Sequence, residues 1–549
     1  MVAKEGAESP LIIDTGVEKN RLQQTNRQEL TMRLVALVLT TLLCPGTIAA
    51  QSHHDHHHHP PAVIAGDDAP AEIAIDGSKS FQRFEGFGGS LGIFEKDGIF
   101  KAHDHTQPAV VSATANQRSD LASMPHAQIG VSRARIVLSG FEPQNDNADP
   151  FVASGSGFDW KETDFHASAL ASGKSLGLRT PWISFSLDGS DADAWRRRSG
   201  SACALDPVFV DEEVEWILEA LQHFKDLGME LPYATVNNEP DLCDSGYKIE
   251  IADYVEIVKQ LGRRLRERGI ETKLVVSDGW VPQNAVLYME AVLADADARQ
   301  YVGALAFHSY DAYDNPQAIL AAADAGPPLH EATQRRERIR ELAATYALPV
   351  WMTEVCYCNP RELRDWELLR ARLNHIHDEL TVTNVAALDV MNLWFIRRPQ
   401  VNDELVEVFF NPAGPLERSE ISQYGTLVAH WARFIPPGAL RVAVRSSEPR
   451  IRVTAFRSET GASTMVMLNN ATTARSIRLE FSGIGSVRSL SSITSGEEYL
   501  WQIGSAVGVT DGRVEVAVPS RGVMTLTTLA TCGGSGRPSK PCRRRAVRP

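Results

Sequence analysis

The chain has 549 residues, of which 43% are hydrophobic and 23% charged, a composition typical of a soluble globular protein. It is too long for one ordinary hydrophobic core, so we expect two folded domains. The 55 basic and 69 acidic residues leave a formal charge of −14, which argues against general nucleic-acid binding. This charge excludes no class of neutral small molecule as a ligand.

The first 50 residues have the pattern of a leader. A stretch that begins at Met32 contains one arginine, an apolar run of about ten residues and a small-residue end at Ala49 and Ala50. The apolar run is too short to span a bilayer and is typical of a secretory signal peptide. We therefore predict that Met32 is the true initiator and that the protein is secreted or extracytoplasmic, with no membrane association after cleavage.

Two other segments lack the pattern of a folded domain. Residues 51–70 carry a histidine-rich run and predict a linker, with metal scavenging as the alternative role. Residues 531–549 are rich in glycine, proline and basic residues and predict a disordered tail, with surface anchoring as the alternative. Six cysteines lie outside the leader, and the sequence does not assign their pairs: Cys203, Cys243, Cys356, Cys358, Cys532 and Cys542.

Between residues 84 and 436, apolar strand-like segments alternate with helix-like segments. Val255, Val258, Leu261 and Leu265, for example, form one apolar stripe on a helix. The predicted strands are 84–92, 129–138, 178–186, 231–240, 272–279, 302–310, 348–355 and 385–396. Eight strand–helix units predict an α/β fold, a (β/α)₈ TIM barrel. A doubly wound sheet is the competitor, but no glycine-rich phosphate turn follows the first strand.

The pattern changes in residues 437–530. Segments 450–456, 476–481 and 513–518 alternate apolar and polar residues and are separated by turn residues, which predicts an antiparallel β-sandwich. Residues 71–83, which precede the barrel, are predicted to join this sandwich as a further strand. The chain would then cross between the two domains and hold them together.

Two glutamates lie near the ends of predicted barrel strands. Glu239 follows an apolar run in "NNEP", and Glu354 follows another in "WMTEV". The carboxyl ends of barrel strands build the active site, so both side chains would converge on one mouth. Hydrolysis of an acetal needs such a pair, because one acid protonates the leaving oxygen while the other attacks the reacting carbon.

The other candidate substrate-binding residues are polar or aromatic side chains near strand ends: Asn238, Arg135, Trp182, His308, Tyr310 and Trp394. An amide beside the first glutamate is suited to bind a sugar hydroxyl, and tryptophans at a barrel mouth are natural sugar-stacking platforms. Each has a structural alternative. The histidine and the tryptophans could be core residues, and the arginine could brace the barrel interior by pairing with a carboxylate.

Together these motifs resemble glycoside hydrolase family 30, a family of (β/α)₈ retaining β-glycosidases, over roughly residues 71–528. "FQRFEGFGGSLG" and "GVSRARIVLSG" are similar to its first two strands, and "YGTLVAHWARFIPPGALRV" (424–442) is similar to its entry into a side sandwich. "NNEPD" and "WMTEV" resemble its acid/base and nucleophile motifs. The resemblance implies that Glu239 is the acid/base, Glu354 the nucleophile, and Asn238 the partner of the sugar 2-hydroxyl.

The segment "NLWFIRRPQ" (392–400) is similar to one in the glucuronoxylan-cleaving members of this family. An arginine there helps to hold a glucuronate branch, which implies this role for Arg398. This chain departs from those members in two places. It has Gln400 where they have a tyrosine, and it reads Trp-Ile-Ser from Trp182 where they have Trp-Met-Lys.

The resemblance therefore implies a secreted retaining β-glycosidase of polysaccharides or oligosaccharides, with xylan as the first substrate. The alternatives are a β-1,6-glucanase or galactanase, an exo-acting β-glucosidase or β-xylosidase, and a non-catalytic carbohydrate-binding relative. No metal or organic cofactor is expected, because the barrel segments contain no metal-ligand spacing. The expected partner is a carbohydrate, not nucleic acid or a membrane, and the chain is expected to be a monomer.

Overall fold

The computed structural model describes residues 69–91, 93–96, 99–102, 123–139, 160–186, 199–201, 203–243, 248–356, 366–396, 404–410, 416–531 and 536–538. The predicted leader, most of the predicted linker and tail, and Arg398 lie outside these ranges. No helix in the described ranges is both long enough and apolar enough to cross a membrane.

A closed parallel barrel forms the centre of the described chain. Its strands are β2 (Gly86–Leu91), β5 (Arg133–Ser139), β6 (Thr180–Ser186), β7 (Tyr233–Thr235), β8 (Lys273–Gly279), β9 (Val302–His308), β10 (Val350–Glu354) and β11 (Ala387–Ile396). Neighbours pair in this order, and β11 closes the ring by pairing with both β10 and β2. All eight predicted strands are present, so the predicted barrel is confirmed.

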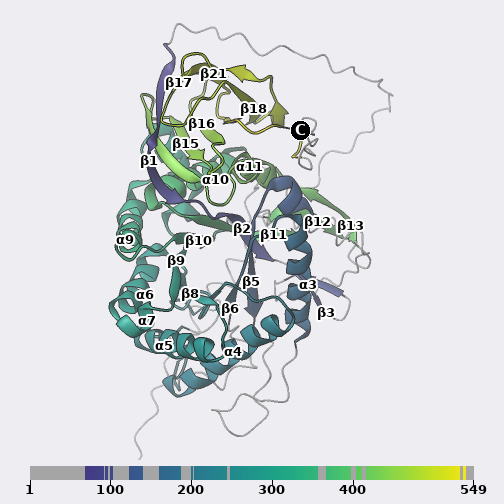
Figure 1. Cartoon of the computed structure of the whole chain (residues 1–549), viewed down its shortest axis with the longest axis vertical. Coiled ribbons are helices and arrows are strands. Elements are labelled where there is room, and N and C mark those ends of the chain that lie inside the picture. The colour runs from purple at the N-terminus through teal and green to yellow at the C-terminus, as the bar shows by residue number, and fades with distance from the viewer. Residues whose placement is uncertain are drawn as a thin grey trace, which may run out of the picture. The chain divides into compact units, whose positions relative to one another are not determined.

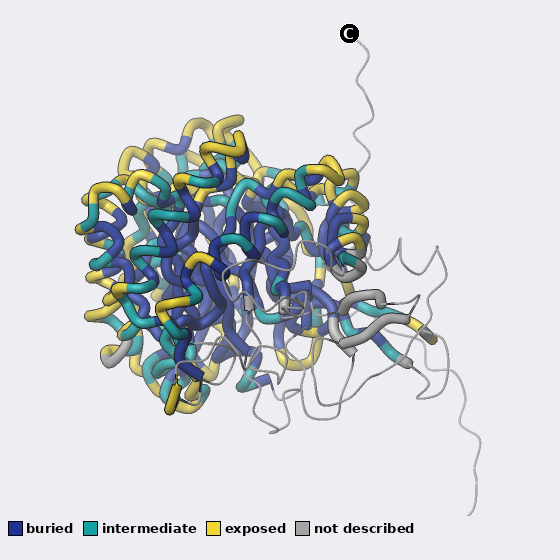
Figure 2. The backbone as a smooth tube through the Cα atoms, turned by 90° about the horizontal axis from the view of Figure 1, so that it is seen from below, coloured by how far each residue is buried: buried dark blue, intermediate teal, exposed yellow. Residues whose placement is uncertain are grey.

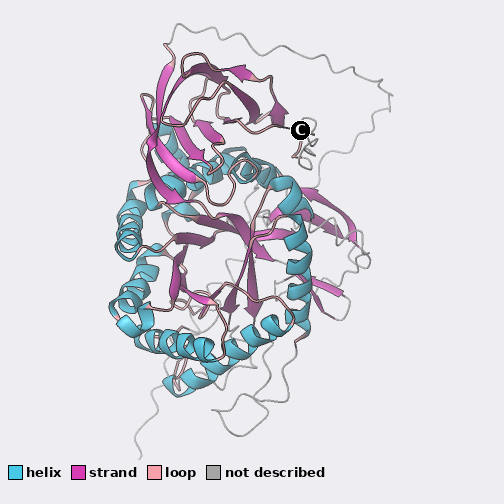
Figure 3. Cartoon of the chain, in the orientation of Figure 1, coloured by secondary structure: helices cyan, strands magenta, loops and turns pink. Residues whose placement is uncertain are grey.

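Helices surround these strands (Figures 1 and 3). They are α3 (Lys161–Leu176), α4 (Val210–Asp226), α5 (Ile251–Glu267), α6 (Pro282–Ala294), α7 (Ala296–Arg299), α8 (Pro316–Ala325), α9 (His330–Tyr346), α10 (Trp366–Asp378) and α11 (Gln423–Ala432). On α5, Val258, Leu261 and Leu265 of the predicted stripe are buried against the barrel. Figure 2 shows the strands buried inside a ring of helices whose outer turns are exposed.

The barrel interior contains a buried ion pair that explains one glycine of the "GFGG" motif. Arg133 on β5 binds Asp389 on β11, with 2.9 Å between Nη2 and Oδ2, and both side chains are wholly buried. A Cβ atom on Gly88 would lie 2.0 Å from Asp389 Oδ1 and 2.5 Å from the Cβ of Arg133. Only glycine leaves room for this pair, because interiors are packed without free space.

Shorter elements extend the barrel. A hairpin of β3 (Ile93–Lys96) and β4 (Ile99–Ala102) follows the first barrel strand. Beyond β11, β12 (Glu404–Phe410) pairs parallel to it, and β13 (Leu416–Ile421) pairs antiparallel to β12. The irregular helices are η1 (Met124–Ile129), η3 (Pro207–Phe209), η4 (Ala312–Asp314) and η5 (Glu379–Thr383).

The side domain is a second ten-stranded sheet, in the order β19-β18-β22-β16-β15-β14-β1-β17-β21 with β20 paired to β18. Its strands are β1 (Ala71–Arg83), β14 (Leu440–Ser446), β15 (Ile451–Arg457), β16 (Ser463–Asn469), β17 (Arg475–Ser482), β18 (Ser489–Gly496), β19 (Tyr499–Ile503), β20 (Val507–Gly508), β21 (Arg513–Val518) and β22 (Val523–Thr527). Although β1 precedes the barrel, it lies between β14, to which it is antiparallel, and β17, to which it is parallel (Figure 1). The sheet encloses a core of its own, with Ile75, Leu479 and Leu526 among the buried residues.

Helix α11 joins the barrel to the side domain. The indole of Trp431 donates to Thr454 Oγ1 at 2.9 Å, and the ring of His430 lies between Thr525 and Ser495 at 2.8 and 2.9 Å. Burial lowers the pKa of His430 to about 3, so this imidazole is neutral. Apolar residues of both domains belong to one continuous core, for example Phe84 and Phe456. This shared core disfavours free motion between the domains.

Candidate active site

Two neighbouring strand ends are held together through an unusual backbone conformation. Glu239, shortly after β7, has φ of 48°, and Asp278, near the end of β8, has φ of 62°. The Glu239 N–H donates to the Asp278 carbonyl at 3.0 Å. Left-handed conformations at non-glycine residues cost of order 1–3 kcal/mol each and persist where the surroundings impose them. Both residues lie at the carboxyl ends of neighbouring barrel strands.

Glu354, the last residue of β10, is held by a cation and a phenol. Its Oε2 forms an ion pair with Arg135 Nη1, and its Oε1 accepts a hydrogen bond from the Tyr310 hydroxyl at 2.8 Å. Burial alone would raise the pKa of Glu354, but the charges of His308 and Arg135 and the Tyr310 hydrogen bond lower it. The carboxylate is therefore ionised at neutral pH, as a nucleophile must be.

His308, at the end of β9, connects two acids. Its Nδ1 lies 2.8 Å from Glu239 Oε1, and its Nε2 lies 3.1 Å from Asp278 Oδ1. Burial alone would lower the pKa of His308, but the negative charges of Glu354 and Asp278 outweigh it and raise the pKa to about 10. At neutral pH the imidazole is a buried cation that donates from both nitrogens.

Asp278 is a further buried acid of this cluster, and the sequence analysis did not single it out. It accepts hydrogen bonds from Arg135 Nη2 at 2.8 Å, Ser184 Oγ at 2.6 Å and Thr353 Oγ1 at 2.5 Å. Burial alone would raise its pKa, but the charges of Arg135 and His308 hold it well below the usual range. The available signal was an acid at the end of an apolar strand, the same context that identified Glu239 and Glu354.

Asn238 is oriented by the same arginine. Arg135 Nη2 donates to Asn238 Oδ1 at 2.5 Å, and the Asn238 backbone N–H donates to the Phe185 carbonyl at 2.5 Å. The amide oxygen of Asn238 thus accepts from a buried cation. Arg135 thus contacts Asn238, Asp278 and Glu354 at once.

The two glutamates lie close together. One oxygen from each of Glu239 and Glu354, and one nitrogen of His308, all lie within 4.8 Å of one another. The carboxyl groups of retaining glycosidases are about 5–5.5 Å apart, and those of inverting enzymes about 6.5–9.5 Å apart. The same three atoms have the spacing of metal ligands, but a protonated imidazole offers no lone pair to a metal, and Arg135 already neutralises Glu354.

The structure buries both predicted tryptophans. Trp182 is wholly buried inside the barrel, and its indole donates to Asp389 Oδ2 at 3.1 Å. Trp394 on β11 belongs to the core and is paired with Leu91 and Val406 of the adjacent strands. A stacking role for these two residues therefore stays a prediction from sequence. Arg398 lies outside the described residues.

A second charged cluster lies behind the catalytic one. Successive residues at the end of β9 contact the two clusters in turn. His308 and Tyr310 contact the glutamates. Ser309 Oγ lies 2.6 Å from Nη2 of Arg336 on α9, and Asp311 Oδ2 lies 2.6 Å from its Nη1. Arg336 is wholly buried and also binds Glu379 of η5 at 2.8 Å. Arg336 therefore binds the same segment that carries His308 and Tyr310.

A disulfide restrains the loop that follows Glu239. Cys203 and Cys243 are bonded, with their Cα atoms 5.4 Å apart. Their neighbourhood is tied further by backbone hydrogen bonds, from Lys248 N–H to the Cys203 carbonyl and from Leu205 N–H to the Lys248 carbonyl. Cys356, shortly after Glu354, is also in a disulfide. A disulfide-bonded cysteine thus follows each glutamate within four residues.

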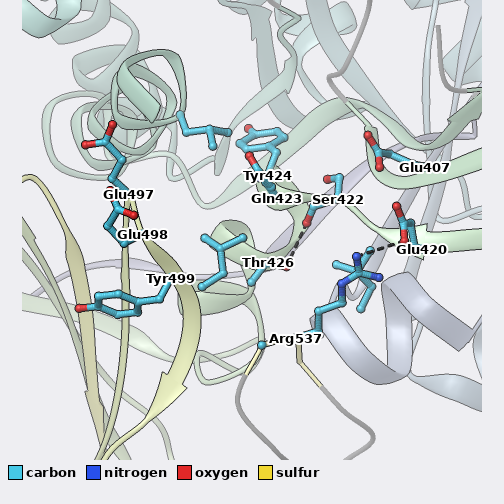
Figure 4. A pocket seen from close by; sticks show the side chains of 14 residues that line it. Glu407, Glu420, Ser422, Gln423, Tyr424, Thr426, Glu497, Glu498, Tyr499 and Arg537 are labelled. Carbon is cyan, nitrogen blue, oxygen red and sulfur yellow. Dashed lines mark hydrogen bonds and ion pairs between the residues drawn. The ribbon is translucent and has the colours of Figure 1, made fainter. Parts of the chain in front are cut away.

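A cavity of about 450 Å³ lies apart from these residues, between the start of α11 and the β18–β19 hairpin (Figure 4). Its lining includes Glu407 and Glu420 of the β12–β13 hairpin, and Tyr499 of β19. Arg537 enters from the C-terminal segment and pairs with Glu420 at 3.1 Å, the dashed line on the right of Figure 4. No residue of the catalytic cluster lines this cavity.

No protein-family model matches the chain. Among characterised proteins, the chain is similar to glucuronoxylanase XynC of Bacillus subtilis, at 28% identity over 181 residues. That alignment covers 32% of this chain and 38% of the enzyme, so the match spans well under half of the relative's length.

Solved structures match over far more of the chain. A family 30 endoxylanase from Clostridium papyrosolvens C71 has a TM-score of 0.60 at 16% identity, covering 84% of this chain and 100% of that structure. An endo-β-1,6-glucanase has a TM-score of 0.59 at 16% identity, covering 85% and 95%. The predicted resemblance is thus confirmed in the fold: this chain has the (β/α)₈ barrel and β-rich side domain of glycoside hydrolase family 30 structures.

Proposed function

We propose that the protein is a retaining β-glycosidase that uses Glu354 as nucleophile and Glu239 as acid/base. The observation that carries the proposal is the proximity of these two carboxyl groups, with oxygens within 4.8 Å of each other. That proximity suits direct attack by one carboxylate, because it is shorter than the separation of about 6.5–9.5 Å found in inverting enzymes.

In the first step, ionised Glu354 attacks the anomeric carbon and forms a glycosyl ester. The bond to the leaving oxygen breaks, and that oxygen takes the proton of Glu239. In the second step, Glu239 removes a proton from water, whose oxygen attacks the anomeric carbon and releases Glu354. His308 and Arg135 are buried cations beside these carboxylates, so they stabilise the negative charge that moves between them.

For the substrate, we propose a β-linked xylan. Similarity to a glucuronoxylanase and to a family 30 endoxylanase supports this choice. A β-1,6-glucan is the second candidate, because an endo-β-1,6-glucanase matches the structure almost equally well. Arg398 as the ligand of a glucuronate branch remains a prediction from sequence, as do export through the segment that begins at Met32 and action as a monomer.

The test is release of reducing sugar from a panel of glucuronoxylan, unbranched xylan, β-1,6-glucan and β-1,6-galactan. We expect hydrolysis of a xylan, with a product whose first-formed anomer by proton NMR is β. Glu354→Gln should abolish it. A first-formed α anomer would contradict the retaining mechanism, and binding without hydrolysis of any polymer would instead indicate a non-catalytic relative.

A further inference from the structure

An exposed tryptophan lies at the carboxyl end of the barrel, directly after β8. Trp280 follows Asp278 and Gly279, and 36% of its surface is exposed. Every other tryptophan in the described ranges is buried or half-buried, for example Trp182 and Trp351 inside the barrel. Large apolar rings at a surface often mark a binding site, and this ring is on the edge where the catalytic side chains converge.

The position of Trp280 is fixed relative to Glu239. Its backbone N–H donates to Asp241 Oδ1 at 2.9 Å, and the other oxygen of Asp241 accepts from Asn284 Nδ2 at 2.9 Å. The Glu239 N–H also donates to the Asp278 carbonyl at 3.0 Å. Two hydrogen bonds therefore join the turn that carries Glu239 to the turn that carries Trp280, and the disulfide at Cys243 restrains the same loop.

We propose that Trp280 is a stacking platform for the sugar on the leaving-group side of the scissile bond. The inference rests on the proposed function, in which Glu239 gives its proton to the leaving oxygen. The leaving sugar must therefore lie beside Glu239, and Trp280 is the exposed aromatic ring whose backbone is fixed to the Glu239 turn. The ligand class is a β-linked pyranose, whose C–H face packs on the apolar face of an indole.

The chain offers a matched control. Tyr499, on β19 of the side domain, is also 36% exposed, but it lines the cavity of Figure 4, which no residue of the catalytic cluster lines. Truncation of either ring removes a similar exposed aromatic surface. Only Trp280→Ala should affect a sugar at the barrel mouth.

The experiment compares two substrates in wild type, Trp280→Ala, Trp280→Phe and Tyr499→Ala. One is xylan, whose cleavage places a sugar on the leaving-group side, and the other is β-xylobiosyl fluoride, whose leaving group is a small anion. We expect Trp280→Ala to lower kcat/KM on xylan by roughly tenfold, which corresponds to about 1.4 kcal/mol of lost binding in the transition state. Its kcat/KM on the fluoride should be unchanged, and Trp280→Phe should keep most of the xylan activity.

Tyr499→Ala should match wild type on both substrates. An equal loss on xylan and on the fluoride in Trp280→Ala, or no loss on either, would overturn the proposal. If the wild-type protein hydrolyses the fluoride but not xylan, the substrate pair is changed. β-1,6-Glucan then replaces xylan, and gentiobiosyl fluoride replaces β-xylobiosyl fluoride. Failure of wild type on every fluoride and polymer would refute the proposed function itself, and it would be seen before any Trp280 variant is compared.

Discussion

The imidazole Nδ1 of His308 lies 2.8 Å from Oε1 of Glu239, while Nε2 of the same ring lies 3.1 Å from Asp278 Oδ1. A buried cation thus touches Glu239, the proposed acid/base, on one side and a buried anion on the other. When Glu239 gives up its proton, the new carboxylate already has a charged donor beside it. The negative charge that forms on Glu239 is therefore stabilised without any reorganisation of solvent. Such preorganised electrostatic stabilisation is a major source of catalysis.

The charge of His308 should appear in the pH dependence of stability. Its pKa is raised from 6.5 to about 10 in the folded protein, so its contribution is fully present below pH 6.5 and is lost as pH rises toward 10. We expect His308→Gln to be less stable than wild type at pH 6, with a difference in melting temperature that shrinks toward pH 10. Thermal unfolding followed by circular dichroism measures this. A difference that stays constant with pH would show that the imidazole is not a cation in the folded state.

The two glutamates should be separable by chemical rescue. Glu239→Gln should lose roughly 10²–10⁴-fold of its activity on polymers but still form the glycosyl ester from a substrate with an activated phenol. Azide, which needs no base, should then restore turnover and give a β-glycosyl azide. In Glu354→Ala, azide should instead enter the vacated space and give an α-glycosyl azide. NMR of the azide products decides, and the reverse pattern would exchange the two roles.

Arg336 should matter far more to stability than a neighbour on the same helix. It is wholly buried between Asp311 and Glu379, so Arg336→Met leaves buried carboxylates without their cation and should cost about 3–5 kcal/mol. Arg338 pairs with Glu290 at 2.8 Å but is 47% exposed, so Arg338→Met should cost about 0–1 kcal/mol. Urea denaturation of both variants provides the comparison. Similar losses in the two variants would contradict a supporting role for the buried cluster.

Much of this architecture could be predicted because it depends on local pattern. The barrel strands are continuous apolar runs, and the rule that active sites lie at their carboxyl ends then places Glu239 and Glu354 together. The pairing of Cys203 with Cys243 could not be predicted, since it depends on which loops meet above the barrel. For the same reason the sequence could not distinguish buried Trp182 from exposed Trp280.

Arg336 illustrates a second limit. It lies in the highly charged stretch "QRRERIRE" of α9, where several arginines look alike. Arg336 is wholly buried, whereas Arg338 is largely exposed, because only Arg336 faces the segment that ends β9. The helical period of the sequence shows which residues lie on one face of α9. It does not show which side chains pack against that face, because those come from distant parts of the chain.

The last prediction concerns Asp278, whose charge acts on both ends of the pH profile. The negative charge of Asp278 raises the pKa of Glu354 and helps to raise that of His308. In Asp278→Asn both pKa values should therefore fall, while the amide oxygen can still accept from Arg135 and Ser184. The acidic limb of kcat/KM, where Glu354 must ionise, should move to lower pH. The alkaline limb, where His308 loses its proton, should move in the same direction. The whole pH profile should shift toward lower pH, and the free energy of unfolding should fall by about 1.5–3 kcal/mol because the charged hydrogen bonds are weakened.

Initial rates on a glycosyl fluoride measure the profile without a leaving group that needs protonation. A profile whose limbs stay fixed while only its height falls would mean that Asp278 supports the site by packing alone.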